Sequence, residues 1–138
     1  MYKLIKIMFL LILLSVTSNL AIAQQTPFSD FPSDVQAKIN ENKAKGSPLL
    51  EGVVFKYELI IDPQFRNHYP SSNDLNVVLS QIKTNLEFND FSFVYAENKQ
   101  LIVKFQGQKD LKYDDIKILM TEKKLYLLNI THSTSLKQ

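Results

Sequence analysis

The chain has 138 residues, of which 45% are hydrophobic, with 16 Lys and Arg against 14 Asp and Glu. The formal charge of +2 comes from Lys3 and Lys6, so residues 24–138 are formally neutral. A neutral chain does not attract nucleic-acid phosphates or anionic lipids, and we expect neither partner. The hydrophobic content excludes a wholly disordered chain, and the absence of cysteine excludes disulfides, thiolate metal sites and cysteine nucleophiles.

Residues 1–23 have the three parts of a secretory signal peptide. Lys3 and Lys6 form a positive start, an apolar run follows from Ile7, and Ala21 and Ala23 precede the expected cleavage site. An uncleaved anchor would need about 20 continuous apolar residues, but polar residues begin at Ser15. We therefore predict an exported protein, periplasmic or secreted, without a membrane anchor after cleavage.

Residues 24–52 form a lead-in rich in proline and glycine. Ser33 and Asp34 are suitable caps for a short helix that would continue to about Lys45. Few apolar residues are available to anchor such a helix, so we favour a linker exposed to solvent over a packed element.

From Val53 onward the apolar pattern predicts regular structure over residues 53–132, followed by a polar tail over residues 133–138. Val53 to Ile61 alternates as a strand does, and helical spacing follows the capping residues Ser71 to Asp74. Two further strands form a hairpin around the turn at residues 96–99, a second helix follows Asp110, and the last strand covers residues 125–130.

This order predicts an α+β fold, the ferredoxin-like βαββαβ sandwich, with a four-stranded antiparallel sheet and two helices on one face. Right-handed crossovers place the first and third strands in the middle. The expected core between sheet and helices consists of Phe55, Tyr57, Leu59, Ile61, Val78, Leu79, Ile82, Leu86, Phe91, Phe93, Tyr95, Leu101, Val103, Phe105, Ile116 and Leu119.

The region from Phe55 to Ile130 resembles a heavy-metal-associated domain. The resemblance rests on the Leu-rich first helix, the hairpin leading to Leu101-Ile102-Val103-Lys104-Phe105, and Asp114-Asp115-Ile116-Lys117 opening the second helix. That family binds metal through a Cys-x-x-Cys between the first strand and helix, where this chain has Asp62 to Pro70 without cysteine. The resemblance therefore implies the fold but not copper or zinc transfer.

His68 lies in this loop and is the one candidate for a weak metal or small-ligand site. A stable site needs two or three further nitrogen or oxygen ligands, and Asp62, Asp74 and the distant His132 are the candidates. An exposed loop histidine is the simpler interpretation. Asp110, Asp114 and Asp115 are explained as helix-capping acids rather than acid–base catalysts. We predict no cofactor and no catalytic residue.

The sheet face opposite the helices is the remaining candidate for function. It is expected to present a partly apolar surface, and such surfaces often mark partner sites. The candidate residues are Val54, Ile60, Val94, Ile102 and Lys104. Coverage of this face by residues 24–52 is an equal alternative, and the outer strands offer edges for pairing. We predict a non-enzymatic domain that binds a protein, a peptide or an envelope component. The sequence does not define the partner or the oligomeric state.

Overall fold

A computed structural model describes residues 26–138. The signal peptide predicted for residues 1–23 lies outside this range. No helix in the part of the chain that the structure describes is long and apolar enough to cross a membrane. The elements are the 3₁₀ helices η1 (Phe28–Asp30) and η2 (Pro63–Asn67), the α-helices α2 (Ser33–Lys45), α3 (Ser72–Asn85) and α4 (Tyr113–Glu122), and the strands β1 (Val53–Ile61), β2 (Phe88–Tyr95), β3 (Leu101–Gly107) and β4 (Leu127–Leu136).

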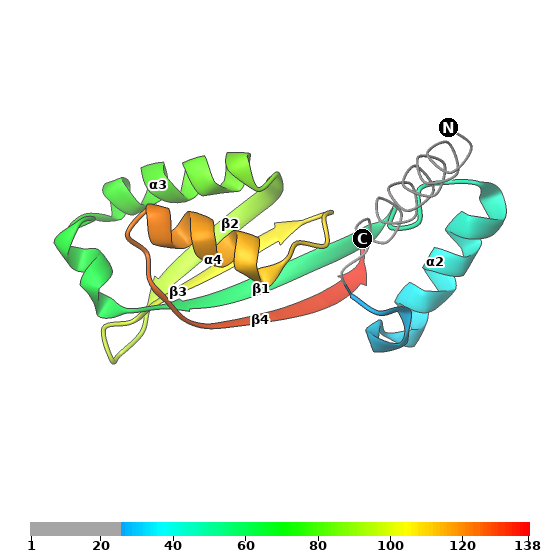
Figure 1. The fold of residues 1–138 in the computed structure, drawn as a ribbon, viewed down its shortest axis with the longest axis horizontal. Helices are drawn as coiled ribbons and strands as arrows, with labels where there is room; N and C mark the ends of the chain where they lie inside the picture. The colour runs from blue at the N-terminus through cyan, green and yellow to red at the C-terminus, as the bar shows by residue number, and fades with distance from the viewer. Residues whose placement is uncertain (1–25) are drawn as a thin grey trace, which may run out of the picture.

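The four strands form one antiparallel sheet in the order β2-β3-β1-β4. The first and third strands are central, as predicted. Figure 1 shows α3 and α4 on the same side of this sheet, with α2 at the other end of the molecule beside β1 and β4. The α+β class is therefore confirmed, and the order of elements from β1 to β4 is roughly that of the ferredoxin-like fold.

The core lies between the helices and every second residue of the central strands. Most of the predicted members are fully buried, including Leu59, Val103 and Ile116. Tyr95 is a correction, since it is 45% exposed, and Phe91, Phe93, Leu86 and Leu119 are only partly buried. β2 is an edge strand and is covered less completely than β1 and β3. The prediction omitted these buried residues: Phe31, Val35, Ile39, Val53, Phe65, Leu75, Phe88, Met120 and Leu125.

Helix α2 contradicts the prediction of an exposed linker. Val35 and Ile39 are buried in the same core as the sheet, and the Phe31 ring meets the Phe55 ring edge-on at 6.3 Å. The side-chain amide of Asn42 donates to the carbonyls of Leu49 at 3.0 Å and Glu51 at 2.8 Å. A narrow stripe at positions 35, 39 and 42 is therefore sufficient to fix this helix.

β4 continues to Leu136, beyond the predicted boundary at residue 132. Leu136 lies opposite Val53, and the amide of Lys137 donates to the carbonyl of Gly52 at 2.7 Å. Residues 133–136 are therefore part of the sheet rather than of a polar tail. Ser133 and Ser135 carry little strand signal of their own, but pairing with the apolar β1 holds them in the ladder.

Candidate functional site

Strand register arranges the open face of the sheet, opposite α3 and α4, in three cross-strand rows. The first row holds Val94, Ile102, Ile60 and Asn129; the second holds Ser92, Lys104, Glu58 and Thr131; the third holds Asp90, Gln106, Lys56 and Ser133. Each row takes one residue from each strand, because residues opposite one another in a sheet point to the same face. The open face is thus apolar in one row and polar in the next two.

The apolar row joins three of the predicted partner residues. Ile102 lies opposite both Val94 and Ile60, so their side chains are adjacent on the open face. Val94 is 58% exposed, and Ile60 and Ile102 are half-buried. Three neighbouring apolar side chains that remain accessible to solvent form a small surface that a partner could cover with a gain in free energy.

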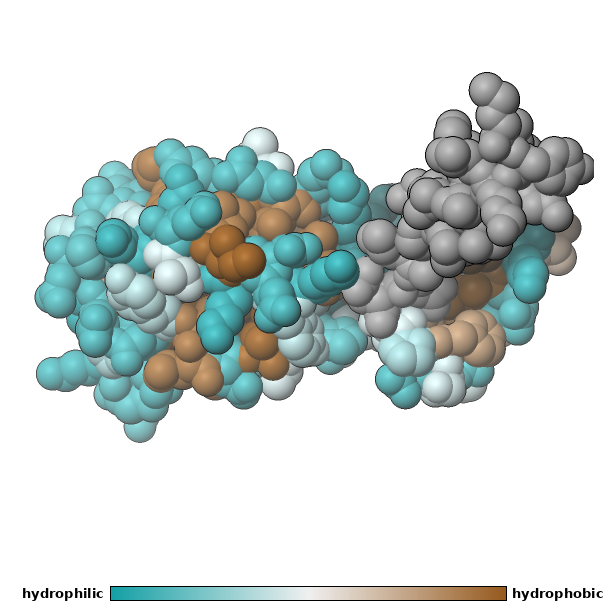
Figure 2. Space-filling view, viewed as in Figure 1, coloured by the Kyte–Doolittle hydropathy of each residue, from teal (hydrophilic) through white to brown (hydrophobic). Residues whose placement is uncertain are grey.

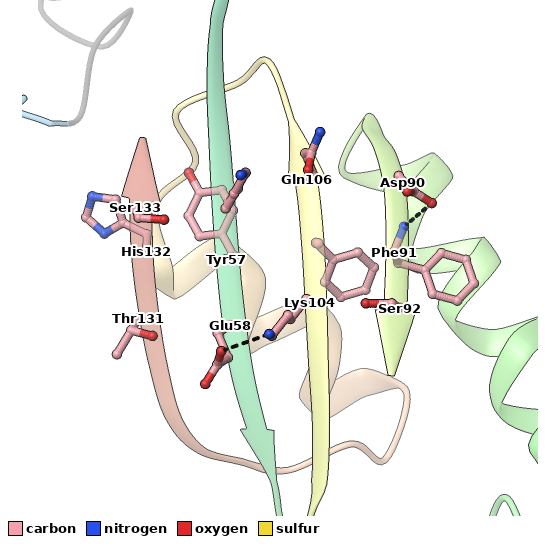
Figure 3. Close-up of a pocket in the computed structure, with 12 residues that line it drawn as sticks. Tyr57, Glu58, Asp90, Phe91, Ser92, Lys104, Gln106, Thr131, His132 and Ser133 are labelled. Atoms are coloured by element: carbon pink, nitrogen blue, oxygen red, sulfur yellow. Dashed lines mark hydrogen bonds and ion pairs between the residues drawn. The ribbon is translucent and has the colours of Figure 1, made fainter. Parts of the chain in front are cut away.

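Beside this row, Lys104 Nζ lies 3.8 Å from Glu58 Oε2, with Ser92 and Thr131 at the two ends of the same row (Figure 3). The side chains of Lys104 and Glu58 are 66% and 45% exposed, so their ion pair contributes little to stability. The polar rows line a shallow hollow of about 430 Å³. This arrangement offers charges of both signs and several hydroxyls at one accessible place.

Residues 26–52 of the lead-in do not line this hollow, because its lining residues all belong to the four strands. Residues 26–52 pack elsewhere: Phe31 lies against Phe55 on the helix side of β1, and Thr26 donates to Asp110 through its backbone amide and its hydroxyl. Val54 is a correction to the predicted surface. It is only 7% exposed and is therefore inaccessible to a partner.

The segment before His68, which the sequence indicates only as a loop, contains the 3₁₀ helix η2. Asp62 caps η2 by accepting a hydrogen bond from the Gln64 amide, Phe65 is buried, and the Tyr69 hydroxyl donates to the carbonyl of Lys123 at 2.5 Å. These contacts place His68 at the surface, at the end of η2. Within residues 26–138 no three His, Asp or Glu side chains come together as a metal site would require. Asp74 lines one hollow together with His68, but the set of three ligands that the prediction required is not formed among these residues.

A polar cluster near the start of α4 was not anticipated. The Tyr57 hydroxyl accepts from the Leu111 amide at 2.7 Å and donates to the Lys109 carbonyl at 3.3 Å, and burial raises the pKa of Tyr57 to about 12. The Tyr113 hydroxyl bonds His132 Nδ1. These bonds join the loop before α4 to β1 and join α4 to β4. The alternation pattern along β1 indicates only that Tyr57 belongs to the core.

The three aspartates near the start of α4 have different surroundings. Asp114 and Asp115 lie in the first turn of α4, where negative charge is favourable. Asp110 accepts two hydrogen bonds from Thr26, so it fastens the lead-in to the loop before α4. Sequence spacing gives no indication of a contact across 84 positions.

Exposed apolar side chains occur on other parts of the surface as well. Val77 on α3, Ile118 on α4 and Leu128 on β4 are 62%, 59% and 52% exposed. Figure 2 shows hydrophobic side chains over the region of α3 and α4. An apolar surface is therefore not unique to the open face, and a test of function must compare the two sides.

Comparison of the chain with known protein families, curated proteins and solved structures finds no match. The molecule is thus defined by its own features: a small α+β domain with one sheet face covered by helices and one accessible face that combines an apolar row with exposed charges. The resemblance to heavy-metal-associated domains stays an expectation from the sequence.

Proposed function

We propose that this chain is an exported, non-enzymatic binding domain of the ferredoxin-like type, and that it binds a protein partner on the open face of its sheet. The single observation that carries the proposal is the apolar row of Val94, Ile102 and Ile60 beside the exposed Lys104–Glu58 pair. Apolar contact favours association, and charges of both signs make it selective.

The chemistry of this face favours a protein over other macromolecules. Its charged residues are Lys56 and Lys104 against Glu58 and Asp90, so it has no excess of positive charge for nucleic acid or an anionic membrane. The open-face rows contain no aromatic side chain on which a base could stack. An apolar side chain flanked by polar groups, as on a peptide or protein surface, fits this pattern.

Export is supported by the sequence of residues 1–23, which combines a positive start, an apolar run and small residues before Gln24. Among residues 26–138, the core cluster and the residues packed against it lie between Phe31 and Leu136. Residues 24–138, the chain expected after cleavage, contain all of them and are used for the binding experiments.

The proposal is tested by photo-crosslinking from two matched positions. A photoreactive amino acid replaces Val94 on the open face or Ile118 on α4, two apolar residues with nearly equal exposure, 58% and 59%. We expect crosslinks to one defined protein from position 94 and none to that protein from position 118. The purified partner is then titrated by calorimetry against the Val94→Glu and Ile118→Glu variants.

Val94→Glu is expected to weaken binding at least tenfold, about 1.4 kcal/mol, because it places a charge in the apolar contact. Ile118→Glu is expected to leave the affinity within twofold. Loss of binding in Ile118→Glu alone would place the partner on the helix side and overturn the proposal. Stoichiometric uptake of copper or zinc that is abolished by His68→Ala would replace it with metal binding.

A further inference from the structure

The two edges of the sheet differ in how they are protected. The edge strand β2 carries Asp90, where its pairing with β3 also shifts register, and α3 packs against it. Charge, irregularity and a covering helix are the usual means by which proteins prevent an edge from pairing with another strand. The β2 edge is therefore protected.

The opposite edge, β4, is also contacted by helices, α2 and α4, but its middle lacks the other two devices. Between Leu127 and Leu136 there is no Asp, Glu, Lys, Arg or Pro, and the pairing with β1 is regular from Asn129 to Leu136. Asn129, Thr131, His132 and Ser133 are exposed. We define Asn129–Ser133 as the β4 edge. No other strand of residues 26–138 pairs with its outer side.

We infer that the β4 edge pairs antiparallel with the β4 edge of a second copy of this chain, forming a two-fold symmetric dimer with one continuous sheet. The argument for a second copy is self-complementarity. A two-fold axis at Thr131 places Asn129 opposite Ser133, Ile130 opposite His132, and Thr131 opposite itself, with the open faces on one side. No pair brings two charged residues together, and hydroxyl and amide pairs across strands are favourable.

The dimer would join two open faces. Thr131 and Ser133 belong to the polar rows that line the hollow, so pairing at β4 places two hollows side by side. The inference stands independently of the proposed partner, because it concerns the chain alone. A ladder this short buries less surface than a typical stable interface, so we expect a weak, concentration-dependent dimer.

The second polar row supplies a matched pair of variants. Thr131 and Ser92 are hydroxyl residues at opposite ends of this row, on β4 and β2, on either side of the Glu58–Lys104 pair (Figure 3). Sedimentation equilibrium of residues 24–138 is expected to show a monomer–dimer equilibrium. Thr131→Lys is expected to weaken it at least tenfold by placing two lysines at the axis, whereas Ser92→Lys is expected to change it less than twofold.

Spin labels distinguish the β4 dimer from any other. The chain contains no cysteine, so Thr131→Cys or Ser92→Cys gives one labelling site in each copy. Pairing at β4 puts the two 131 backbones about 5 Å apart, which gives strong dipolar broadening. The two 92 positions are separated by seven strand spacings, about 34 Å, and their spectrum stays narrow.

Three results would overturn the inference. The first is a monomer up to millimolar concentration, which would leave the edge free for the strand of another protein. The second is a dimer that Ser92→Lys disrupts and Thr131→Lys does not. The third is a dimer whose 92 labels, rather than its 131 labels, broaden. Circular dichroism spectra that match the parent chain show that each lysine variant is folded.

Discussion

The two faces of one strand, β1, differ in burial and in composition. Tyr57 and Leu59 point to the helices and are 2% and 0% exposed, while Lys56 and Glu58, which alternate with them, lie on the open face. The helix side packs apolar and aromatic residues closely, and the open side holds a weak ion pair, hydroxyls and a short apolar row. Alternate residues of the same strands thus form the buried core and the accessible face that we propose as the binding surface.

The largest expected effect comes from truncating adjacent residues of β1 that point to opposite faces. Leu59→Ala is expected to lower the free energy of unfolding by about 2–5 kcal/mol, because it leaves a cavity in the core. Ile60→Ala, next in the chain but half-buried on the open face, is expected to cost about 1–2 kcal/mol. Urea unfolding monitored by circular dichroism measures both values.

The difference between these two losses is the informative quantity. Equal losses for Leu59→Ala and Ile60→Ala would mean that the open face is as important for stability as the core. That result would contradict the division between the two faces. A change in the slope of the free energy against urea would show that a variant no longer unfolds in the same two states.

A second prediction concerns the polar contact of the helix side. Tyr57→Phe removes the acceptor of the Leu111 amide and the donor to the Lys109 carbonyl, and we expect a loss of about 1–3 kcal/mol at neutral pH. Its pH dependence follows from the pKa of Tyr57, which burial raises from 10.0 to about 12. The unfolded chain ionises this hydroxyl near pH 10, and the folded chain only near pH 12. The contribution of the neutral hydroxyl to the free energy of unfolding is therefore complete below pH 10 and is lost as the pH rises towards 12.

The advantage of the parent chain over Tyr57→Phe is therefore expected to shrink between pH 10 and pH 12, measured as the free energy of unfolding in urea at several pH values. Tyr126→Phe, at an exposed ring, is the matched control and is expected to change stability by less than about 0.5 kcal/mol. A constant difference between the parent chain and Tyr57→Phe across this range would show that the hydroxyl of Tyr57 does not titrate as a buried group.

Much of this architecture could be predicted from the sequence because alternation is strong where burial is one-sided. The residues from Val53 to Ile61 and from Leu101 to Phe105 indicate both strands and the faces they bury. The packed helix α2 could not be predicted in this way. Its buried residues are few, and the contacts that fix it lie outside the helix: Phe31, just before it, meets Phe55, and Asn42 donates to the turn at residues 49–51.

The candidate site was predicted in part for the same reason. Alternation placed Ile60, Val94 and Ile102 on the open face, and strand register makes them neighbours in one row. It also placed Val54 there, yet Val54 is buried. The contacts of Asp110 with Thr26 and of Tyr113 with His132 join distant segments, and no local pattern of residue types indicates them.

The smallest expected effect concerns the ion pair in the middle of the open face. A double-mutant cycle with Glu58→Gln and Lys104→Met is expected to give a coupling free energy below about 1 kcal/mol, decreasing further with added salt, because both side chains are exposed. The free energies of unfolding of the four chains supply the cycle. A coupling above about 2 kcal/mol that salt does not reduce would make the pair part of the stable framework. A weak coupling leaves both charges able to exchange their contact with each other for contacts with a partner, since little free energy is lost when the pair separates.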